Sequence, residues 1–138
     1  MCCFNRPYDD QTYLTIALES EAKLYVQREA LQGNFELAWS YILDYENSFN
    51  PYESRRVAIS RWRSIATVDV DISEDIETLA NNIMHKGIKK KDALHIACAI
   101  TADCHYFLTT DKKLLNKHFH ENTLINPLDF VRGLEARR

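Results

Sequence analysis

The chain has 138 residues, of which 46% are hydrophobic and 27% charged, a composition typical of one globular domain with its own core. Its net charge of −3 excludes a protein that binds nucleic acid through overall positive charge alone. No apolar run approaches the roughly 20 residues that a membrane span needs. The start, MCCFNRPYDD, also lacks the apolar core of a signal peptide, so we expect a cytoplasmic protein.

The first half of the chain predicts helices separated by short extended segments. Residues 8–31 show helical spacing, with Leu14, Leu18 and Ala22 in one apolar line and Asp9 or Asp10 placed to cap the helix. A strand is expected over residues 35–39. The following elements, in chain order, are a helix over 41–47 capped by Ser40, a helix over 52–65, an extended edge segment over 67–72 and a helix from Ser73 to about Lys86.

Residues 89–115, KKKDALHIACAITADCHYFLTTDKKLL, organise the second half. Residues 93–102 are apolar on nearly every face, which predicts a helix buried against a sheet. Residues 105–108 have the length and bulk of a buried strand. Asp92 opens the helix, and Asp111 follows the strand at its carboxyl end, where the ligand crevice of an open parallel sheet lies.

After this stretch the sequence predicts a short helix over 112–119, a brief strand at 124–125 and a final helix from Pro127. Strands that are separated by helices imply a parallel sheet covered on both faces. The four cysteines are interpreted as reduced thiols, because Cys2 and Cys3 are adjacent and Cys98 lies in the predicted buried helix.

Basic residues cluster although the net charge is negative. Ordinary solvated faces explain most such clusters, but two of them flank the acids at 92 and 111. Acids that hold a metal, with bases nearby for phosphate, are the combination that a nuclease needs. The aromatic residues, Trp39 and Trp62 among them, could stack on bases, although core or interface packing is the more frequent role. The clusters are Arg55, Arg56, Arg61 and Arg63; Lys89–Lys91; and Lys112, Lys113 and Lys117.

With these acids identified, the chain resembles a PIN domain, the fold of VapC-type toxin ribonucleases and related nucleases. Three motifs carry the resemblance, in the family's order: WSYILDYE, KKKDALHIACA and FLTTDKKLL. They place the family's acids at Glu46, Asp92 and Asp111, with Thr109 as a supporting hydroxyl. NRPYDDQ also resembles the amino-terminal motif of one bacterial PIN-like subgroup.

The resemblance implies one domain over residues 1–138, folded as a helix-rich three-layer α/β/α sandwich with a central, mostly parallel sheet. It implies an endoribonuclease of the toxin-antitoxin type that hydrolyses RNA phosphodiesters with Mg²⁺ or Mn²⁺. Glu46, Asp92 and Asp111 are then the catalytic acids that hold the metal, while Lys91 and Lys112 contact phosphate. A cognate antitoxin and a homodimer are the partners that such relatives imply.

One departure from the family concerns the start of the chain. PIN domains begin with a strand that ends in a metal-binding aspartate, but here no apolar run precedes Cys2 and no acid precedes Asp9. We therefore expect the first strand to be missing, either because the recorded start lies downstream or because the protein lacks it. Activity would be impaired in that case. The alternatives are a catalytically inactive PIN-fold protein that binds protein or RNA, and a helix-rich scaffold without a site.

Each acid also has a purely structural alternative. Asp92 could cap the buried helix, and Asp111 could cap the helix that follows it. Glu46 could be a solvated helix residue, and Asp44 either a surface residue or a partner of the site. These alternatives make different predictions about burial and hydrogen bonding.

Overall fold

The computed structural model describes residues 2–119 and 121–136. The chain forms two compact units, which are described separately. The terminal unit combines Met1–Phe35 with Tyr106–Arg138, and the middle unit is Glu36–His105. Each unit contains helices and one parallel pair of strands, so the predicted α/β class is confirmed.

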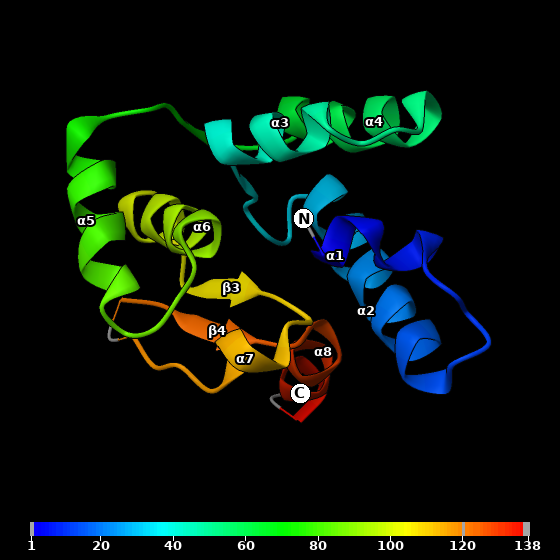
Figure 1. The fold of residues 1–138 in the computed structure, drawn as a ribbon. Coiled ribbons are helices and arrows are strands. Elements are labelled where there is room, and N and C mark those ends of the chain that lie inside the picture. Colours follow the sequence, from blue (N-terminus) through cyan, green and yellow to red (C-terminus); the bar gives the residue numbers. More distant parts are fainter. Residues whose placement is uncertain (1, 120, 137–138) are drawn as a thin grey trace. The chain divides into compact units, whose positions relative to one another are not determined.

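The terminal unit is built around the long helix α2, Leu14–Leu31, which packs against α8, Pro127–Ala136. Its strands β3, Tyr106–Leu108, and β4, Thr123–Ile125, lie side by side in parallel, with Tyr106 opposite Thr123 (Figure 1). The shorter elements of this unit are α1, Cys2–Asn5; the 3₁₀ helix η1, Arg6–Tyr8; and α7, Lys112–Leu115.

The middle unit contains the parallel pair β1, Ala38–Ser40, and β2, Val68–Val70, with Ala38 opposite Val68. Helix α5, Glu74–Met84, packs along α6, Lys90–Thr101 (Figure 1). Every residue of α6 from Ala93 to Cys98 is buried, which confirms the prediction of a helix with hardly any exposed face. The remaining elements are α3, Tyr41–Ser48; α4, Glu53–Ser60; and η2, Arg61–Ser64.

Two of the predicted helix caps are confirmed. Ser40 Oγ accepts a hydrogen bond from the Leu43 N–H at 3.4 Å, and Ser73 Oγ accepts one from the Ile76 N–H at 3.3 Å. Each serine thus satisfies one of the backbone donors that a helix leaves open at its start. After α5, Gly87 adopts a φ of 82°, a left-handed conformation that glycine takes without a steric penalty.

The predicted start of the first long helix is wrong. Helix α2 begins at Leu14 rather than at residue 8, and its N-cap is Tyr13, without a side-chain cap. Asp10 instead accepts hydrogen bonds from the Thr12 N–H and hydroxyl, at 3.0 and 2.7 Å, and so forms a local turn. An aspartate that bonds two residues ahead in a turn does not cap the helix beyond it. Helix α7 is also shorter than the predicted 112–119.

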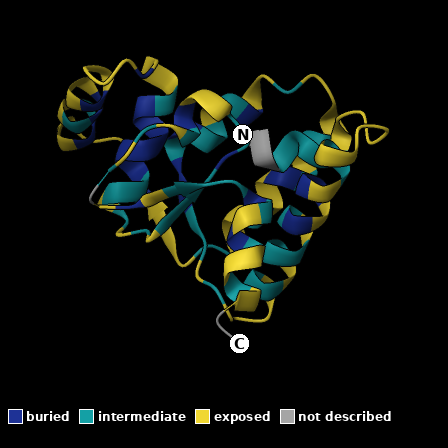
Figure 2. Ribbon diagram, turned by 90° about the horizontal axis from the view of Figure 1, so that it is seen from below, coloured by how far each residue is buried: buried dark blue, intermediate teal, exposed yellow. Residues whose placement is uncertain are grey.

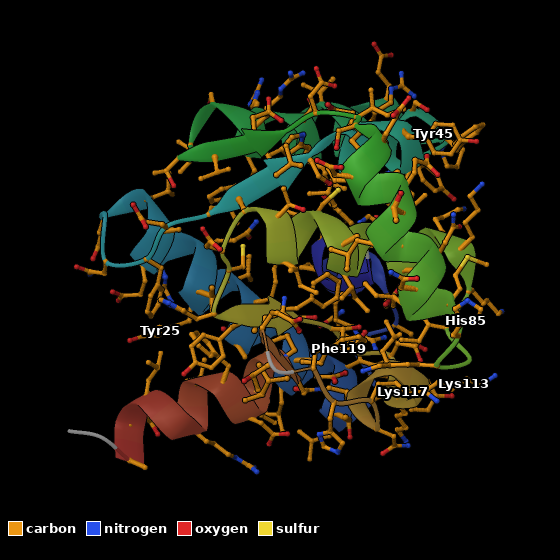
Figure 3. The ribbon with its side chains drawn as sticks, turned by 90° about the vertical axis from the view of Figure 1, so that its left-hand side faces the viewer. Tyr25, Tyr45, His85, Lys113, Lys117 and Phe119 are labelled. Atoms are coloured by element: carbon orange, nitrogen blue, oxygen red, sulfur yellow. The ribbon has the colours of Figure 1, made fainter. Side chains whose placement is uncertain are left out.

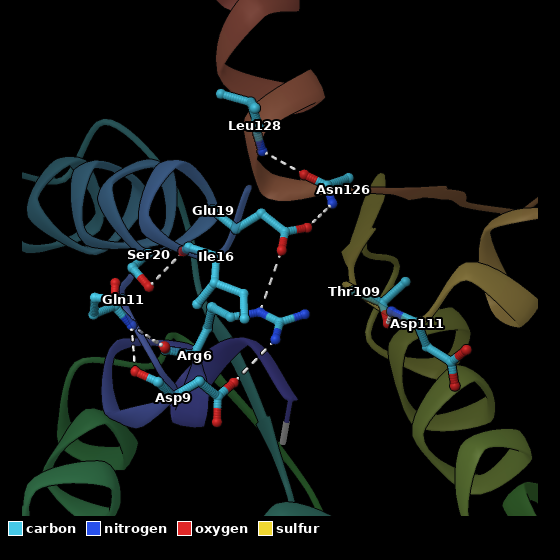
Figure 4. Close-up of polar contacts among 10 residues, drawn as sticks. All are labelled: Arg6, Asp9, Gln11, Ile16, Glu19, Ser20, Thr109, Asp111, Asn126 and Leu128. Carbon is cyan, nitrogen blue, oxygen red and sulfur yellow. Dashed lines mark hydrogen bonds and ion pairs between the residues drawn. The ribbon is translucent and has the colours of Figure 1, made fainter. Parts of the chain in front are cut away.

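The buried face of α2 is not the apolar line predicted from Leu14 and Leu18, because both leucines are exposed. Ala22, the third residue of that line, is buried as predicted, but the other buried residues of the helix are Glu19 and Ser20. Figure 2 shows buried and exposed residues along the ribbon. The Glu19 carboxylate lies 3.3 Å from Arg6 Nε, close enough for an ion pair although not aligned as a hydrogen bond. The second carboxylate oxygen of Glu19, Oε2, accepts a hydrogen bond from Asn126 Nδ2 (Figure 4). This polar network offsets the cost of burying a carboxylate.

The described strands form two separate parallel pairs rather than one continuous sheet. Both pairs are parallel, as the alternation of helices and strands predicted. Among the described helices, none combines the length and the apolar character required to cross a membrane.

Candidate active site

Glu46 is joined to α6 by a hydrogen bond to His95. Glu46 lies on α3, and its Oε1 is 2.8 Å from His95 Nε2. The two side chains are 16% and 8% exposed, so the pair is largely withdrawn from water. The alternative of a solvated Glu46 is therefore wrong.

The pKa of Glu46 is lowered from its usual value of 4.5. Burial by itself raises this pKa, but the hydrogen bond from His95, the charge of His95 and the charge of Lys91 are among the interactions that lower it, and the net shift is downward. Glu46 is consequently an ionised carboxylate at neutral pH, held in a partly dry environment. A carboxylate of this kind is suited to bind a cation.

Asp92 is the third residue of α6, not its N-cap, which is Lys89. The capping alternative for Asp92 is therefore wrong, although an acid in the first turn still interacts favourably with the helix dipole. Asp92 and His95 are three residues apart, which places them on one face of α6. Because α3 packs against α6 and Glu46 bonds to His95, Glu46 is held against α6 three residues after Asp92.

Asp111 belongs to the terminal unit and caps α7. Its Oδ1 accepts a hydrogen bond from the Lys113 N–H at 2.9 Å, so the capping alternative describes it correctly. Its own N–H donates to Thr109 Oγ1 at 3.1 Å (Figure 4). Thr109 is buried and donates its N–H to the Ile125 carbonyl of β4 at 3.0 Å, so the hydroxyl that orients Asp111 is itself anchored.

Glu46 and Asp92 both lie in the middle unit, on α3 and α6, and Asp111 lies in the terminal unit. Within residues 2–119 and 121–136, no group of three or more His, Cys, Asp or Glu side chains that could hold a metal is found. Lys91, predicted to contact phosphate, is exposed beside Asp92, and Lys112 is exposed at the start of α7. Lys113 and Lys117, in and just after α7, extend away from the ribbon (Figure 3).

Sequence reasoning missed His95. It is 49 residues from Glu46 in the chain, and a histidine within an apolar helix has no obvious partner before the fold is known. The available signal was its position three residues after Asp92 on the same face of the helix.

A second cluster, around Asp44, was also missed. Asp44 Oδ1 accepts a hydrogen bond from the buried Trp39 indole at 2.9 Å, and its Oδ2 lies 3.4 Å from Arg63 Nη1. Arg63 Nε donates to Asp69 on β2 at 2.8 Å. Asp44 therefore joins the core to the surface of the middle unit.

The cysteines with described side chains are free thiols, as predicted. Burial raises the pKa of Cys98 to about 11, although a hydrogen bond with Ser40 opposes this. Burial and the nearby Asp103 also raise the pKa of Cys104. Both are protonated at neutral pH and so are poor nucleophiles and poor metal ligands. The side chains of Cys2 and Cys3 lie outside the described residues.

Exposed aromatic rings line α3 and the start of α4. Tyr45 and Phe49 contact each other edge to face, with ring centroids 5.0 Å apart, and Tyr45 points away from the ribbon (Figure 3). The Arg55 guanidinium lies 4.0 Å from the ring centroid of Tyr52. All three rings are more than half exposed. We call Tyr45, Phe49, Tyr52 and Arg55 the aromatic patch.

A family model described as PIN domain matches residues 7–119, most of the chain, and this stretch contains all three predicted acids. The resemblance drawn from the three motifs is thereby confirmed. No curated protein and no solved structure shows a match to the chain.

Proposed function

The chain belongs to the PIN domain family, and from that premise we propose that it is a divalent-metal-dependent ribonuclease that hydrolyses RNA phosphodiesters. The observation that supports this most directly is the Glu46–His95 hydrogen bond, which holds a mostly buried, ionised carboxylate against α6, the helix that carries Asp92. A nearby cation favours the charged form of such a carboxylate.

The chemistry of these side chains fits Mg²⁺ or Mn²⁺. Both ions prefer oxygen ligands, and Mg²⁺ is commonly bound by one or two carboxylates together with water and the phosphate of the substrate. In the middle unit, Glu46 and Asp92 are the carboxylates that would hold the ion. We propose Asp111 as a third acid and Thr109 as the hydroxyl that orients it, through the bond to the Asp111 N–H.

When bound, such an ion supplies a Lewis acid for the scissile phosphate and lowers the pKa of the attacking water. The chain's own residues bind and orient. Glu46 stays ionised because His95 and Lys91 favour its charged form. Lys91 precedes Asp92 on the exposed side of the helix start, and Lys112 follows Asp111, so both are placed to contact the phosphate backbone.

The aromatic patch supports single-stranded RNA as the substrate class. Exposed rings stack on unpaired bases, and an arginine over such a ring adds positive charge to the same surface. Tyr45 is the residue before Glu46 on α3, so the patch and the proposed site lie on the same helix.

Cleavage of a fluorescent single-stranded RNA with Mn²⁺ tests the proposal. It is measured for the unsubstituted chain, with and without Mn²⁺, and for the Asp92→Asn variant. We expect cleavage by the unsubstituted chain only when Mn²⁺ is present, and none by Asp92→Asn. Asp75→Asn, at an exposed acid of α5, is the matched control and keeps full activity. Unchanged activity in Asp92→Asn would contradict the assignment.

A second candidate function is RNA binding without cleavage by a catalytically inactive PIN-fold protein. The aromatic patch favours it, because stacking on bases needs no metal and no complete set of acids. Binding of labelled RNA that is lost on Phe49→Ala and Tyr52→Ala, together with no cleavage by the unsubstituted chain in the presence of Mn²⁺, would select this alternative.

The finer assignments follow from the family. We propose a single PIN domain over residues 1–138, a toxin of the VapC type with a cognate antitoxin, a homodimer in solution and a cytoplasmic location. Co-expression with the product of the adjacent gene, followed by measurement of the mass of the purified particle, tests the antitoxin and the dimer together.

A further inference from the structure

We propose that two copies of this chain associate through the exposed face of α2, which pairs with α2 of the second copy in antiparallel orientation. The inference rests on the homodimer proposed above, to which it gives a surface, but not on ribonuclease activity. It concerns only residues of the terminal unit.

Leucines follow one side of α2 and are left open to solvent. Leu14 is 73% exposed, Leu31 is 56% exposed, and Leu18 and Leu24 are each 40% exposed. With two exposed charged residues they follow one another in steps of three or four, the spacing of one helix face. We call these six residues the leucine face: Leu14, Leu18, Glu21, Leu24, Arg28 and Leu31.

The other side of α2 is already occupied. Glu19, Ser20 and Ala22 are buried there, and α2 packs against α8. The Glu19 carboxylate contacts Arg6 and Asn126 on that side, so α2 cannot turn its leucines inward without breaking this polar network. The helix therefore keeps a row of apolar side chains in water, and a row of this kind marks an interaction surface rather than a scattered exposed leucine.

The two charges on the leucine face make it complementary to itself in one orientation. Glu21 precedes Leu24 by three residues, and Arg28 follows Leu24 by four. In an antiparallel pair whose two-fold axis passes close to Leu24, Glu21 of each copy lies at about the level of Arg28 of the other, and Leu24 meets its own counterpart. A parallel pair would instead set Glu21 against Glu21 and Arg28 against Arg28, and these like charges repel.

The same register matches the remaining leucines. With the axis close to Leu24, Leu18 of one copy lies at about the level of Leu31 of the other, so apolar side chains meet on both sides of each charge pair. Association removes these leucines from water, which is the main favourable contribution to protein association. RNA does not suit this face, because leucine side chains offer no ring for stacking on bases and Glu21 repels phosphate.

Charge exchange tests the antiparallel register. Glu21→Arg and Arg28→Glu each set like charges opposite each other in the dimer, so each single variant should weaken it. The double variant Glu21→Arg with Arg28→Glu exchanges the two charges and should restore the dimer. An equimolar mixture of the two single variants should also associate, because both charge pairs are matched in the mixed dimer. Glu135→Arg, at an exposed acid of α8, is the matched control.

Two further substitutions test the apolar contact. Leu24→Ser and Leu31→Ser each remove an exposed leucine from the face, and both should weaken the dimer. Ile72→Ser is the matched control, because Ile72 is 64% exposed and lies in the middle unit.

The readout is the mass of the 138-residue chain in sedimentation equilibrium over a range of protein concentrations. We expect a monomer–dimer equilibrium that dissociates on dilution, because one helix face is at the small end of protein interfaces. Each single charge variant and each leucine variant should raise the dissociation constant by about 10-fold or more. The double charge variant, the mixture and both controls should associate as the unsubstituted chain does. Melting temperatures are measured in parallel by circular dichroism.

The outcomes separate this inference from the earlier proposals. A monomer at every concentration would overturn both the homodimer and its surface, and would assign the leucine face to a different partner. A dimer whose dissociation constant is unchanged in all the α2 variants would overturn the role of α2 and leave the homodimer in place. Weakening by both single charge variants without recovery in the double variant or the mixture would overturn the antiparallel pairing. If a leucine variant does not fold, the exposed charge variants decide. RNA cleavage is not measured, so failure of the proposed ribonuclease activity is a separate result.

Discussion

The indole of Trp39 donates to Asp44 Oδ1 at 2.9 Å, across the turn that begins α3. Trp39 is fully buried, so its N–H has no access to bulk water. Asp44 also pairs with Arg63, which donates to Asp69 on β2. A single carboxylate therefore joins the core of the middle unit to its surface network.

We expect Asp44→Ala to lower the free energy of unfolding by about 1–3 kcal/mol, because the buried indole loses this acceptor. Asp44→Asn keeps an oxygen at the same position, and so should cost clearly less. Urea unfolding followed by tryptophan fluorescence measures both. Equal destabilisation by the two substitutions would show that the charge pair with Arg63, rather than the indole bond, is the important contact.

The lowered pKa of Glu46 predicts a pH dependence of stability. Because the folded state favours the ionised form, Glu46 contributes stability above its usual pKa of 4.5, and this contribution is lost as the pH falls through the lowered value. The gap in unfolding free energy between the unsubstituted chain and Glu46→Gln should therefore shrink between about pH 6 and about pH 3. A gap that stays constant or widens on acidification would contradict the direction of the shift.

We expect the Arg6–Glu19 ion pair to contribute more to the free energy of unfolding than the exposed Arg132–Asp129 pair does. Glu19 is buried, so Arg6→Ala leaves a carboxylate in a low-dielectric environment with less compensation, at a cost of about 3 kcal/mol. The double substitution Arg6→Ala with Glu19→Gln removes that charge and should recover part of the loss. Arg132→Ala is the control, because the Arg132–Asp129 pair is exposed and at 3.9 Å should contribute under about 0.5 kcal/mol. Chemical denaturation of the unsubstituted chain, Arg6→Ala, the double variant and Arg132→Ala measures these changes in the free energy of unfolding.

Local interactions explain which parts of the fold and the site could be predicted from the sequence. Ser40 and Ser73 cap helices through bonds three residues ahead, and Asp111 caps α7 through a bond two residues ahead, so neighbouring residues suffice to predict all three. The start of α2 was mispredicted because an aspartate such as Asp10 can either cap a helix or form a local turn. In this chain its hydrogen bonds with Thr12 form a turn.

The interactions that define the candidate site are not local. Glu46 and His95 meet across 49 residues, and Glu19 and Asn126 across 107 residues, so neither pair is visible in a window of sequence. Burial of Glu19 on α2 also reverses the usual expectation that the apolar line of a helix faces the core. Only the packing of one element on another reveals such contacts, whereas the prediction of the acids at positions 46, 92 and 111 rests on the family motifs alone.

The most direct test of the account is whether one cation is bound by acids from all three motifs. Mn²⁺ titrated into the 138-residue chain, with paramagnetic broadening mapped by NMR, reports every amide close to the ion. We predict that the signals of Glu46, Asp92 and Asp111 broaden together at the same Mn²⁺ concentration, and that Asp92→Asn weakens all three responses. Broadening at Asp111 that is independent of Glu46 and Asp92, or no broadening at any of the three, would contradict a shared metal site.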